Sequence, residues 1–180
     1  KPTVKLPRLL RWLIRIEGLK TDPLVKYLIG KWLYTLQEYK SAISWFKKAA
    51  LSNNGHAQYS LGLCYHKGKG VEKSIAEAKI SYEAAVSVSK HKGARTNLGY
   101  IYECEETPAD LVKAFNFYKT AAEQGLSQAQ YHLARCYRYG LGVQREDQLA
   151  LKWFMESAEL YDKARAQVDQ LTCELGNTPQ

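Results

Sequence analysis

Few residues of this chain could carry out covalent or metal chemistry, and their spacing does not favour it. The chain has four cysteines and four histidines. Cys64 and His66 stand two residues apart, so on a helix their side chains would point in different directions and could not form a nucleophile–base pair. Gly68-Lys69-Gly70 does not follow a strand pattern, as a phosphate-binding loop would. The sequence therefore predicts no catalytic activity, no cofactor and no metal.

Basic residues are better placed for binding than for catalysis. Arg135 and Arg138 stand three apart, on one face of a predicted helix, where they could hold a carboxylate or a phosphate. Residues 1–50 contain eleven Lys or Arg and three Asp or Glu, whereas the other 130 residues contain fifteen of each kind. The excess positive charge is thus confined to the first part of the chain, which favours a local acidic partner over nucleic-acid binding along the whole chain.

The strongest basic segment lies at the start. Residues 1–20 combine an apolar stripe at helical spacing with Arg8, Arg11 and Arg15 on the remaining face. This pattern predicts a basic amphipathic helix that either caps the adjoining structure or binds an anionic partner, nucleic acid or a membrane surface. Because the chain begins with Lys1 rather than Met, we also expect it to be a fragment of a longer protein.

A motif recurs at fixed spacing through the rest of the chain. The segment that begins at Ala57 is repeated at Ala94 and Ala129, at intervals of 37 and 35 residues. Each copy contains two stretches with apolar residues at helical spacing, and in two copies a Gly-x-Gly turn separates them. A pair of short helices cannot bury its apolar face alone, so this periodicity predicts an all-α array of stacked αα-hairpins.

The segments AQYSLGLCYHKGKGV (57–71) and AQYHLARCYRYGLGV (129–143) resemble the Sel1-like repeat (SLR), a longer-looped relative of the tetratricopeptide repeat. The resemblance implies an αα-hairpin solenoid of about four repeats with a capping helix at each end. The expected segments are a capping helix at 1–20, a short tetratricopeptide-like repeat at 21–54, SLR units at 55–89, 90–125 and 126–160, and a capping helix with a tail at 161–180.

By resemblance, the chain is expected to be a non-catalytic scaffold or adaptor, or the regulatory repeat domain of a larger protein. Self-association through the end helices is an alternative. The cysteines lack the within-repeat pairing of one bacterial branch of the family, and the Lys/Asn/Arg clamp of chaperone-binding tetratricopeptide domains is not reproduced. The identity of the partner does not follow from the resemblance.

In such arrays the first helix of each repeat lines the concave side, where a partner segment binds. The positions between the core residues of these helices are rich in Tyr, Arg, Lys and His, as interaction hot spots are. The residues expected to face the groove are Tyr27, Lys31, Tyr34, His56, Tyr59, His66, Tyr100, Glu103, Tyr131, Arg135, Arg138 and Tyr139, together with Leu63, Thr96 and Gln128. Alternatively, several of these tyrosines pack between repeats.

Further expectations concern the core, a helix cap and the cellular compartment. Gly62 and Gly99 are expected to let paired helices approach closely, and Trp45, Trp153 and Phe154 to lie in the core. Asp110 is expected to cap the helix that follows it. The cysteines form no C-x-x-C pair, which predicts buried, reduced thiols and a protein that is not secreted. The expected location is the cytoplasm, with the mitochondrion or the nucleus as alternatives.

Overall fold

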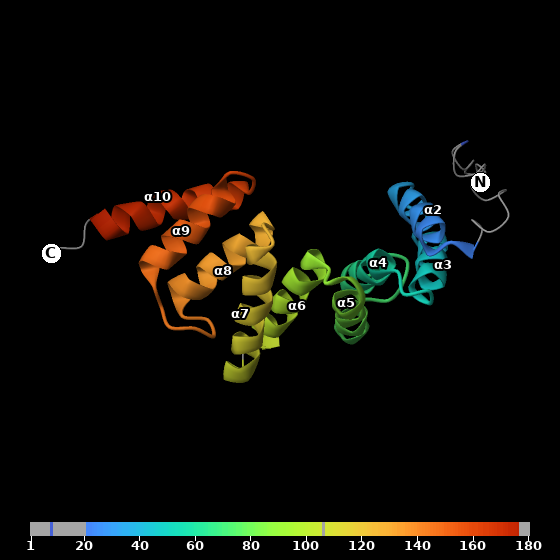
Figure 1. Ribbon diagram of the computed structural model, residues 1–180, viewed down its shortest axis with the longest axis horizontal. Coiled ribbons are helices and arrows are strands. Elements are labelled where there is room, and N and C mark those ends of the chain that lie inside the picture. The colour runs from blue at the N-terminus through green and yellow to red at the C-terminus, as the bar shows by residue number, and fades with distance from the viewer. Residues whose placement is uncertain (1–7, 9–20, 106, 177–180) are drawn as a thin grey trace. The chain divides into compact units, whose positions relative to one another are not determined.

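The computed structural model describes residue 8 and residues 21–105 and 107–176 (Figure 1). Within this part of the chain all regular elements are helices. They are α2 (Pro23–Thr35), α3 (Tyr39–Ala50), α4 (Gly55–Lys67), α5 (Ile75–Ser89), α6 (Lys92–Glu105), α7 (Pro108–Glu123), α8 (Ser127–Tyr139), α9 (Asp147–Ala158) and α10 (Asp162–Gly176). The all-α fold predicted from the sequence is confirmed. The predicted helix at residues 1–20 lies outside the described residues except for Arg8, which is exposed.

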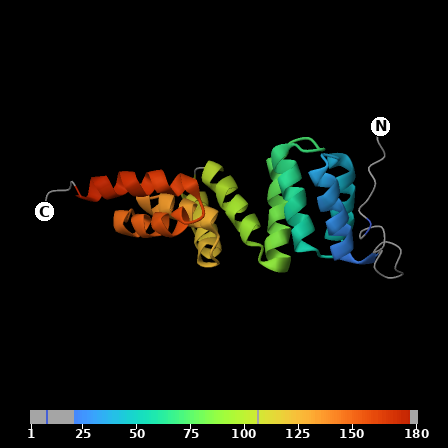
Figure 2. The same cartoon turned by 90° about the horizontal axis from the view of Figure 1, so that it is seen from above.

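Successive helices form four hairpins, α2–α3, α4–α5, α6–α7 and α8–α9, and α10 packs against α9. The chain divides into two compact units, the first ending at His91 and the second beginning at Lys92. Each unit therefore contains two hairpins, and the second also contains α10. Figure 2 shows the helices of the first unit stacked side by side with nearly aligned axes.

Several helices have an N-cap residue, whose side chain accepts hydrogen bonds from the first free amides of the helix. Asp22 Oδ1 accepts hydrogen bonds from the Leu24 and Val25 amides at 2.7 and 3.2 Å, which satisfies two of the free N–H groups at the start of α2. The expectation that Asp110 caps α7 is wrong: Thr107 is the cap, and its hydroxyl accepts from the Asp110 amide at 3.1 Å. Asp110 instead lies in the first helical turn.

Within each hairpin, a small residue on the first helix faces an aromatic ring on the second. A Cβ added at Gly62 would lie 2.4 Å from Tyr82 Cε1, so only glycine allows this approach. The ring of Tyr82 is completely buried. The corresponding pairs in the other hairpins are Gly30 with Phe46, Gly99 with Tyr118, and Ala134 with Phe154. The predicted close approach at Gly62 and Gly99 is confirmed.

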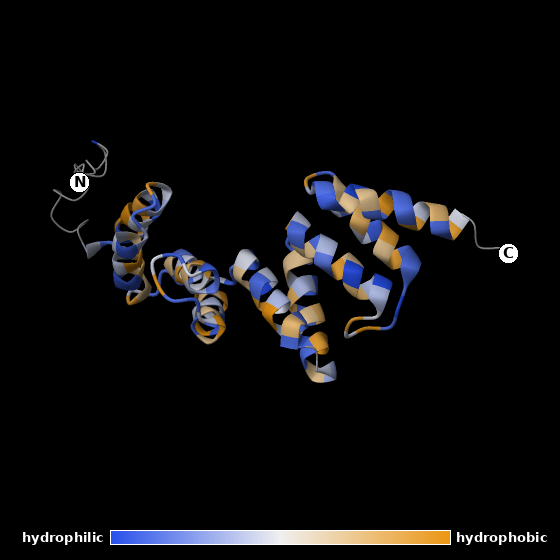
Figure 3. Ribbon diagram, turned by 180° about the vertical axis from the view of Figure 1, so that it is seen from behind, coloured by the Kyte–Doolittle hydropathy of each residue, from blue (hydrophilic) through white to orange (hydrophobic). Residues whose placement is uncertain are grey.

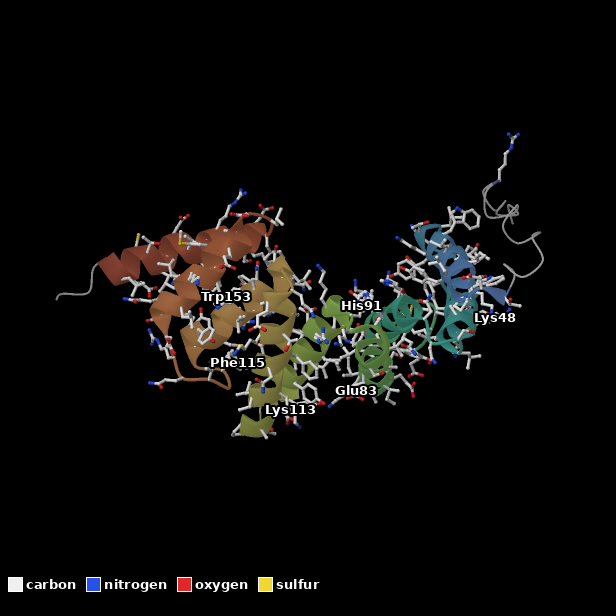
Figure 4. The ribbon with its side chains drawn as sticks, in the orientation of Figure 1. Lys48, Glu83, His91, Lys113, Phe115 and Trp153 are labelled. Atoms are coloured by element: carbon white, nitrogen blue, oxygen red, sulfur yellow. The ribbon has the colours of Figure 1, made fainter. Side chains whose placement is uncertain are left out.

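Trp45 and Trp153 do not belong to this buried row. Phe154 is fully buried, as expected, but Trp153 (Figure 4) and Trp45 are only partly buried at the edges of their clusters. Trp45 is also covered from outside by Lys48, whose ammonium lies 4.7 Å from the ring centroid. The predicted core position of the two tryptophans is therefore wrong, because the adjacent phenylalanine occupies the interior side of the helix.

The two Gly-x-Gly segments join neighbouring repeats as well as neighbouring helices. We call Gly68–Val71 and Gly140–Val143 the glycine turns. All four of their glycines have φ between 65° and 74°, a region that favours glycine. A Cβ at Gly70 would lie 2.6 Å from Tyr39 Cβ, and a Cβ at Gly142 would lie 2.2 Å from the carbonyl oxygen of Leu111. Each turn thus packs directly on the first residues of the second helix of the preceding repeat.

Helix α10 closes the second unit. Its polar and apolar residues alternate along the ribbon in Figure 3. Ala164 and Leu171 are buried with Phe154 of α9, whereas charged residues such as Arg165 remain exposed. The helix therefore covers an apolar face of α9, and its predicted role as a C-terminal cap stays a prediction. In the described part of the chain, every helix falls short of the length or the apolar character needed to span a bilayer.

Candidate partner-binding pockets

A pocket in the first unit, here called the first-unit pocket, has an aromatic lining and a volume of about 290 Å³. Its lining residues come from α2, α3, α4 and the residue before α6: Tyr27, Lys31, Tyr34, Thr35, Phe46, Tyr59, Ser60, Leu63 and His91. The structure therefore brings together five of the sequence-predicted groove residues of this unit, namely Tyr27, Lys31, Tyr34, Tyr59 and Leu63. Lys31 is exposed at the pocket and contributes its positive charge.

Aromatic side chains hold one another at one side of this pocket. The rings of Tyr59 and His91 stack with centroids 4.2 Å apart, and His91 (Figure 4) also meets the edge of His56 at 5.2 Å. Tyr27 lies 5.6 Å from His56. His56 thus supports the pocket without lining it. These ring contacts hold Tyr27, Tyr59 and His91 in place in the pocket lining.

His66 occupies a different place from the one expected. It does not line the first-unit pocket, and its Nδ1 lies 3.4 Å from the hydroxyl of Tyr82. Burial lowers the pKa of His66, with smaller contributions from Lys73 and Lys67. His66 is therefore placed to hold the α4–α5 hairpin together rather than to meet a ligand in this pocket.

A pocket of about 390 Å³ in the second unit, here called the second-unit pocket, is polar. Its lining residues come from α6, α8 and the start of α10: Thr96, Asn97, Tyr100, Gln128, Tyr131, His132, Arg135, Tyr161 and Lys163. Five of them, namely Thr96, Tyr100, Gln128, Tyr131 and Arg135, were predicted from the sequence to face the groove. Two carry positive charge, Arg135 and Lys163.

Glu103 does not line the second-unit pocket but positions Arg135. Arg135 donates from one terminal nitrogen to Glu103 Oε1 at 3.0 Å, and the hydroxyl of Tyr118 donates to Glu103 Oε2 at 2.7 Å. His132 stacks on Tyr118 with centroids 4.8 Å apart. Burial lowers the pKa of His132 to about 4, although Glu103 opposes this shift. His132 is therefore neutral at physiological pH, and its ring is packed against Tyr118.

Arg138 has a structural position. Its guanidinium pairs with Asp147 at the start of α9, at 3.0 Å, and with Glu174 of α10. Hydrogen bonds from Arg145 and then Arg138 lower the pKa of Asp147. Arg138 lines neither pocket and its guanidinium already pairs with two carboxylates, which does not favour a joint anion site with Arg135; that site stays a prediction. Tyr139, the last residue of α8, is 57% exposed and also lies outside both linings.

Replacing Arg138 by Ala should therefore loosen α10. The partly buried pair with Asp147 and Glu174 is expected to contribute about 1 kcal/mol, which corresponds to a roughly fivefold loss of hydrogen-exchange protection in α10. The measurement is hydrogen exchange at single-amide resolution. Lys152→Ala, at an exposed lysine of α9, is the control and should leave α10 unchanged. Equal protection in Arg138→Ala and in the control would show that the ion pair does not hold the helix.

The sequence did not point to His91, Tyr161 or Lys163. His91 directly precedes α6 and Tyr161 directly precedes α10, so both occupy the same place relative to the next helix. The ring of Tyr131 packs against that of Tyr161, with centroids 5.2 Å apart, as the ring of Tyr59 packs against that of His91. The signal that could have revealed them is this shared position between repeats, which is hidden because the loops differ in sequence.

The remaining reactive groups of the described residues are the cysteines and the possible metal ligands. All four cysteines are free; Cys64 and Cys136 are buried as expected, but Cys104 and Cys173 are exposed. Burial raises the pKa of Cys64 to about 11 and that of Cys136 to about 12, so neither is a thiolate at neutral pH. Among the described residues, no group of His, Cys, Asp or Glu is suited to hold a metal ion. Arg11 and Arg15, predicted to bind an anionic partner, lie outside the described residues.

Known proteins resemble this chain in sequence and structure. The DAP3-binding cell death enhancer 1 of Rattus norvegicus is 29% identical, with 68% of this chain and 31% of the relative covered. The c5321 protein, a protective antigen of uropathogenic Escherichia coli with an SLR fold, superposes with a TM-score of 0.80 at 27% identity, covering 84% of this chain and 34% of that one. A Sel1 repeat protein from Oxalobacter formigenes superposes with a TM-score of 0.75 at 23% identity, covering 90% and 48%.

The chain spans about a third of the length of the rat relative. The model of the Sel1 repeat matches it four times, at residues 27–54, 55–85, 93–126 and 127–162. The four matches cover more than half of the chain and follow the four hairpins α2–α3, α4–α5, α6–α7 and α8–α9. The chain therefore belongs to the Sel1 repeat family, whose members generally mediate protein–protein interactions on a typically non-catalytic scaffold.

Proposed function

We propose that this chain is a non-catalytic binding scaffold whose pockets receive a segment of a partner protein. The observation that carries the proposal is that, in each unit separately, first-helix residues predicted from the sequence surround a pocket. Both pockets present tyrosine and the second-unit pocket also presents arginine, side-chain types that are enriched where interfaces concentrate their binding energy. Each pocket also uses the residue before the next helix, His91 or Tyr161.

The two pockets offer different chemistry to a partner. The first-unit pocket, with Tyr27, Tyr34 and Leu63, suits an apolar or aromatic side chain. The second-unit pocket is lined mainly by hydroxyl, amide and cationic groups. Such a difference would let one scaffold discriminate between segments, because a buried polar group without a partner costs binding energy.

The test is quantitative affinity capture with charge-reversed pocket residues. We expect Lys31→Glu or Arg135→Glu to reduce the recovery of at least one captured protein about tenfold, which corresponds to about 1.4 kcal/mol. Lys47→Glu and Lys152→Glu are matched controls on exposed sites of the second helices α3 and α9. If every captured protein is recovered equally with pocket variants and controls, the pockets are not the binding surface.

The relatives suggest one named protein to include. The rat relative carries the description DAP3-binding, and this chain matches about a third of it. We therefore propose DAP3 as the first purified candidate in the capture assay. The cytoplasmic location predicted from the cysteine pattern is also part of the proposal. Binding of an anionic partner by the basic segment 1–20 and self-association through end helices remain predictions.

A further inference from the structure

We propose that the second-unit pocket binds an acidic side chain of the partner segment, with Arg135 and Lys163 as the groups that recognise its carboxylate. This inference rests on the proposed scaffold function and specifies the chemistry of one of its pockets. Its basis is the lining, which contains two cationic side chains and no carboxylate. The first-unit pocket has one lysine in an aromatic lining and offers no comparable site.

Arg135 is held in place and still has hydrogen-bond donors that are free to bind a ligand. Its bond to Glu103 engages one terminal nitrogen, and Glu103 is itself fixed by the hydroxyl of the completely buried Tyr118. A guanidinium has five N–H donors in a rigid plane, so donors remain for a ligand. The side chain is 30% exposed, which leaves it accessible from the pocket. A pre-positioned arginine loses little conformational freedom when it binds a carboxylate.

The local charge matches one carboxylate. Arg135 is balanced by Glu103, whereas Lys163 has no ion-pair partner among the described residues. His132 adds no charge at neutral pH because its imidazole is buried. One excess positive charge therefore faces the pocket. A carboxylate carries one negative charge and a phosphate ester about 1.5 to 2, so the balance favours the carboxylate.

The neutral lining residues favour a peptide as the bearer of that carboxylate. Asn97 and Gln128 present amide groups that can both donate to and accept from a peptide backbone. Tyr131 and Tyr161 add apolar ring faces with hydroxyl groups. The pocket volume of 390 Å³ corresponds to about a dozen water molecules, which is more than a carboxylate alone requires. The site is therefore sized for an acidic side chain with adjoining backbone.

The experiment uses capped amino acids as probes on the full chain and follows backbone amide signals by NMR. N-acetyl-glutamate N-methylamide, titrated to tens of millimolar, should shift the amides of Tyr131, Arg135 and Lys163. The isosteric N-acetyl-glutamine N-methylamide should bind about tenfold more weakly, since a charge-assisted hydrogen bond is about twice as strong as a neutral one. Inorganic phosphate, as the third probe, should also bind more weakly than the glutamate probe.

Two variants test the recognising groups. Arg135→Gln and Lys163→Gln should each weaken the glutamate probe about tenfold and leave the weak glutamine probe unchanged. Arg165→Gln, on the exposed face of α10, is the matched control and should bind like the unaltered chain. The amide signals of α7 and α9, in the same unit as the substituted residues, report in the same spectra that the fold of the second unit is retained.

Three outcomes would overturn the inference: equal binding of the glutamate and glutamine probes, tighter binding of phosphate, or no shift at the pocket amides at the highest glutamate concentration. These results are separable from the fate of the scaffold proposal. If Lys31→Glu abolishes capture of a partner while the glutamate probe does not bind, the scaffold function stands and only the acidic specificity fails. If the probe binds but no captured protein depends on either pocket, the scaffold proposal fails.

Discussion

Replacing Gly142 by Ala is expected to lower the free energy of unfolding of the second unit by about 3 kcal/mol, through overpacking and backbone strain together. The added Cβ would lie 2.2 Å from the Leu111 carbonyl oxygen and 2.7 Å from the Val112 amide nitrogen. Both are backbone atoms at the start of α7, so no side-chain rotation can relieve the contact. In addition, Gly142 has a φ of 70°, which alanine adopts only with strain.

Gly125 supplies the control that separates these two causes. Its φ is 74°, yet a Cβ there would meet no atom within 4 Å. Gly125→Ala should therefore cost only the backbone strain, about 1 kcal/mol. The measurement is native-state hydrogen exchange of the amides of α7 and α8. If Gly142→Ala and Gly125→Ala lose equal protection, the contact with α7 contributes nothing, and the role assigned to the glycine turn is wrong.

The second large effect is a loss of folding stability at acidic pH, caused by His132. His132 has a pKa of about 4 in the folded chain, against 6.5 for an ordinary histidine, because it is buried. Because the pKa of His132 is lower in the folded chain than in the unfolded chain, the unfolded chain binds a proton at this histidine more readily. The contribution of this histidine to stability is therefore complete above about pH 6.5 and is lost as the pH falls toward 4. From about pH 7.5 to about pH 5 the loss should be about 2 kcal/mol.

The variant His132→Phe isolates that contribution. It keeps an aromatic ring against Tyr118, 4.8 Å away in the native pair, but it cannot be protonated. Urea unfolding of the second unit at the two pH values should show about 2 kcal/mol less acid sensitivity in the variant than in the unaltered chain. The groups around the site, Glu103 of α6, Arg135 of α8 and Lys163 of α10, are retained in both proteins. Identical pH dependence would mean that His132 titrates normally.

Much of this fold could be predicted because the same sequence pattern occurs in each repeat. The small residue of each first helix and the ring of each second helix recur along the chain, and Gly62 opposite Tyr82 is one case of four. Groove positions such as Tyr59 and Tyr131 follow from the same register. Local spacing thus specifies which helix face is buried, and the hairpin brings the faces together.

Partners that lie far apart in the sequence could not be predicted in this way. Arg138 reaches Glu174, 36 residues further on, and Glu103 turns toward Arg135 on another helix. Glu174 looks like an ordinary exposed residue in the sequence and Glu103 was expected to face the groove, so neither was recognised as the partner of an arginine, and Arg138 was expected to bind a ligand. Loop positions such as His91 were missed because loops do not follow the helical period. The cap of α7 was assigned to the wrong residue because Thr107 and Asp110, both suitable caps, stand close together in the sequence. Only the backbone geometry shows that Thr107 is the cap.

The glycine turns also bear on how the chain folds as it is synthesised. Gly70 packs on α3 and Gly142 on α7, so each turn completes a helix pair that was made before it. During translation, the first hairpin gains this contact only after residue 70 has left the ribosome, and the third only after residue 142. In the hairpin of α6 and α7, α6 ends at Glu105, Thr107 caps α7 and Pro108 begins it, so the described residues of this connection include no such glycine. The nascent chain is therefore expected to mature in steps of two repeats, because domains fold as units from the N-terminal end.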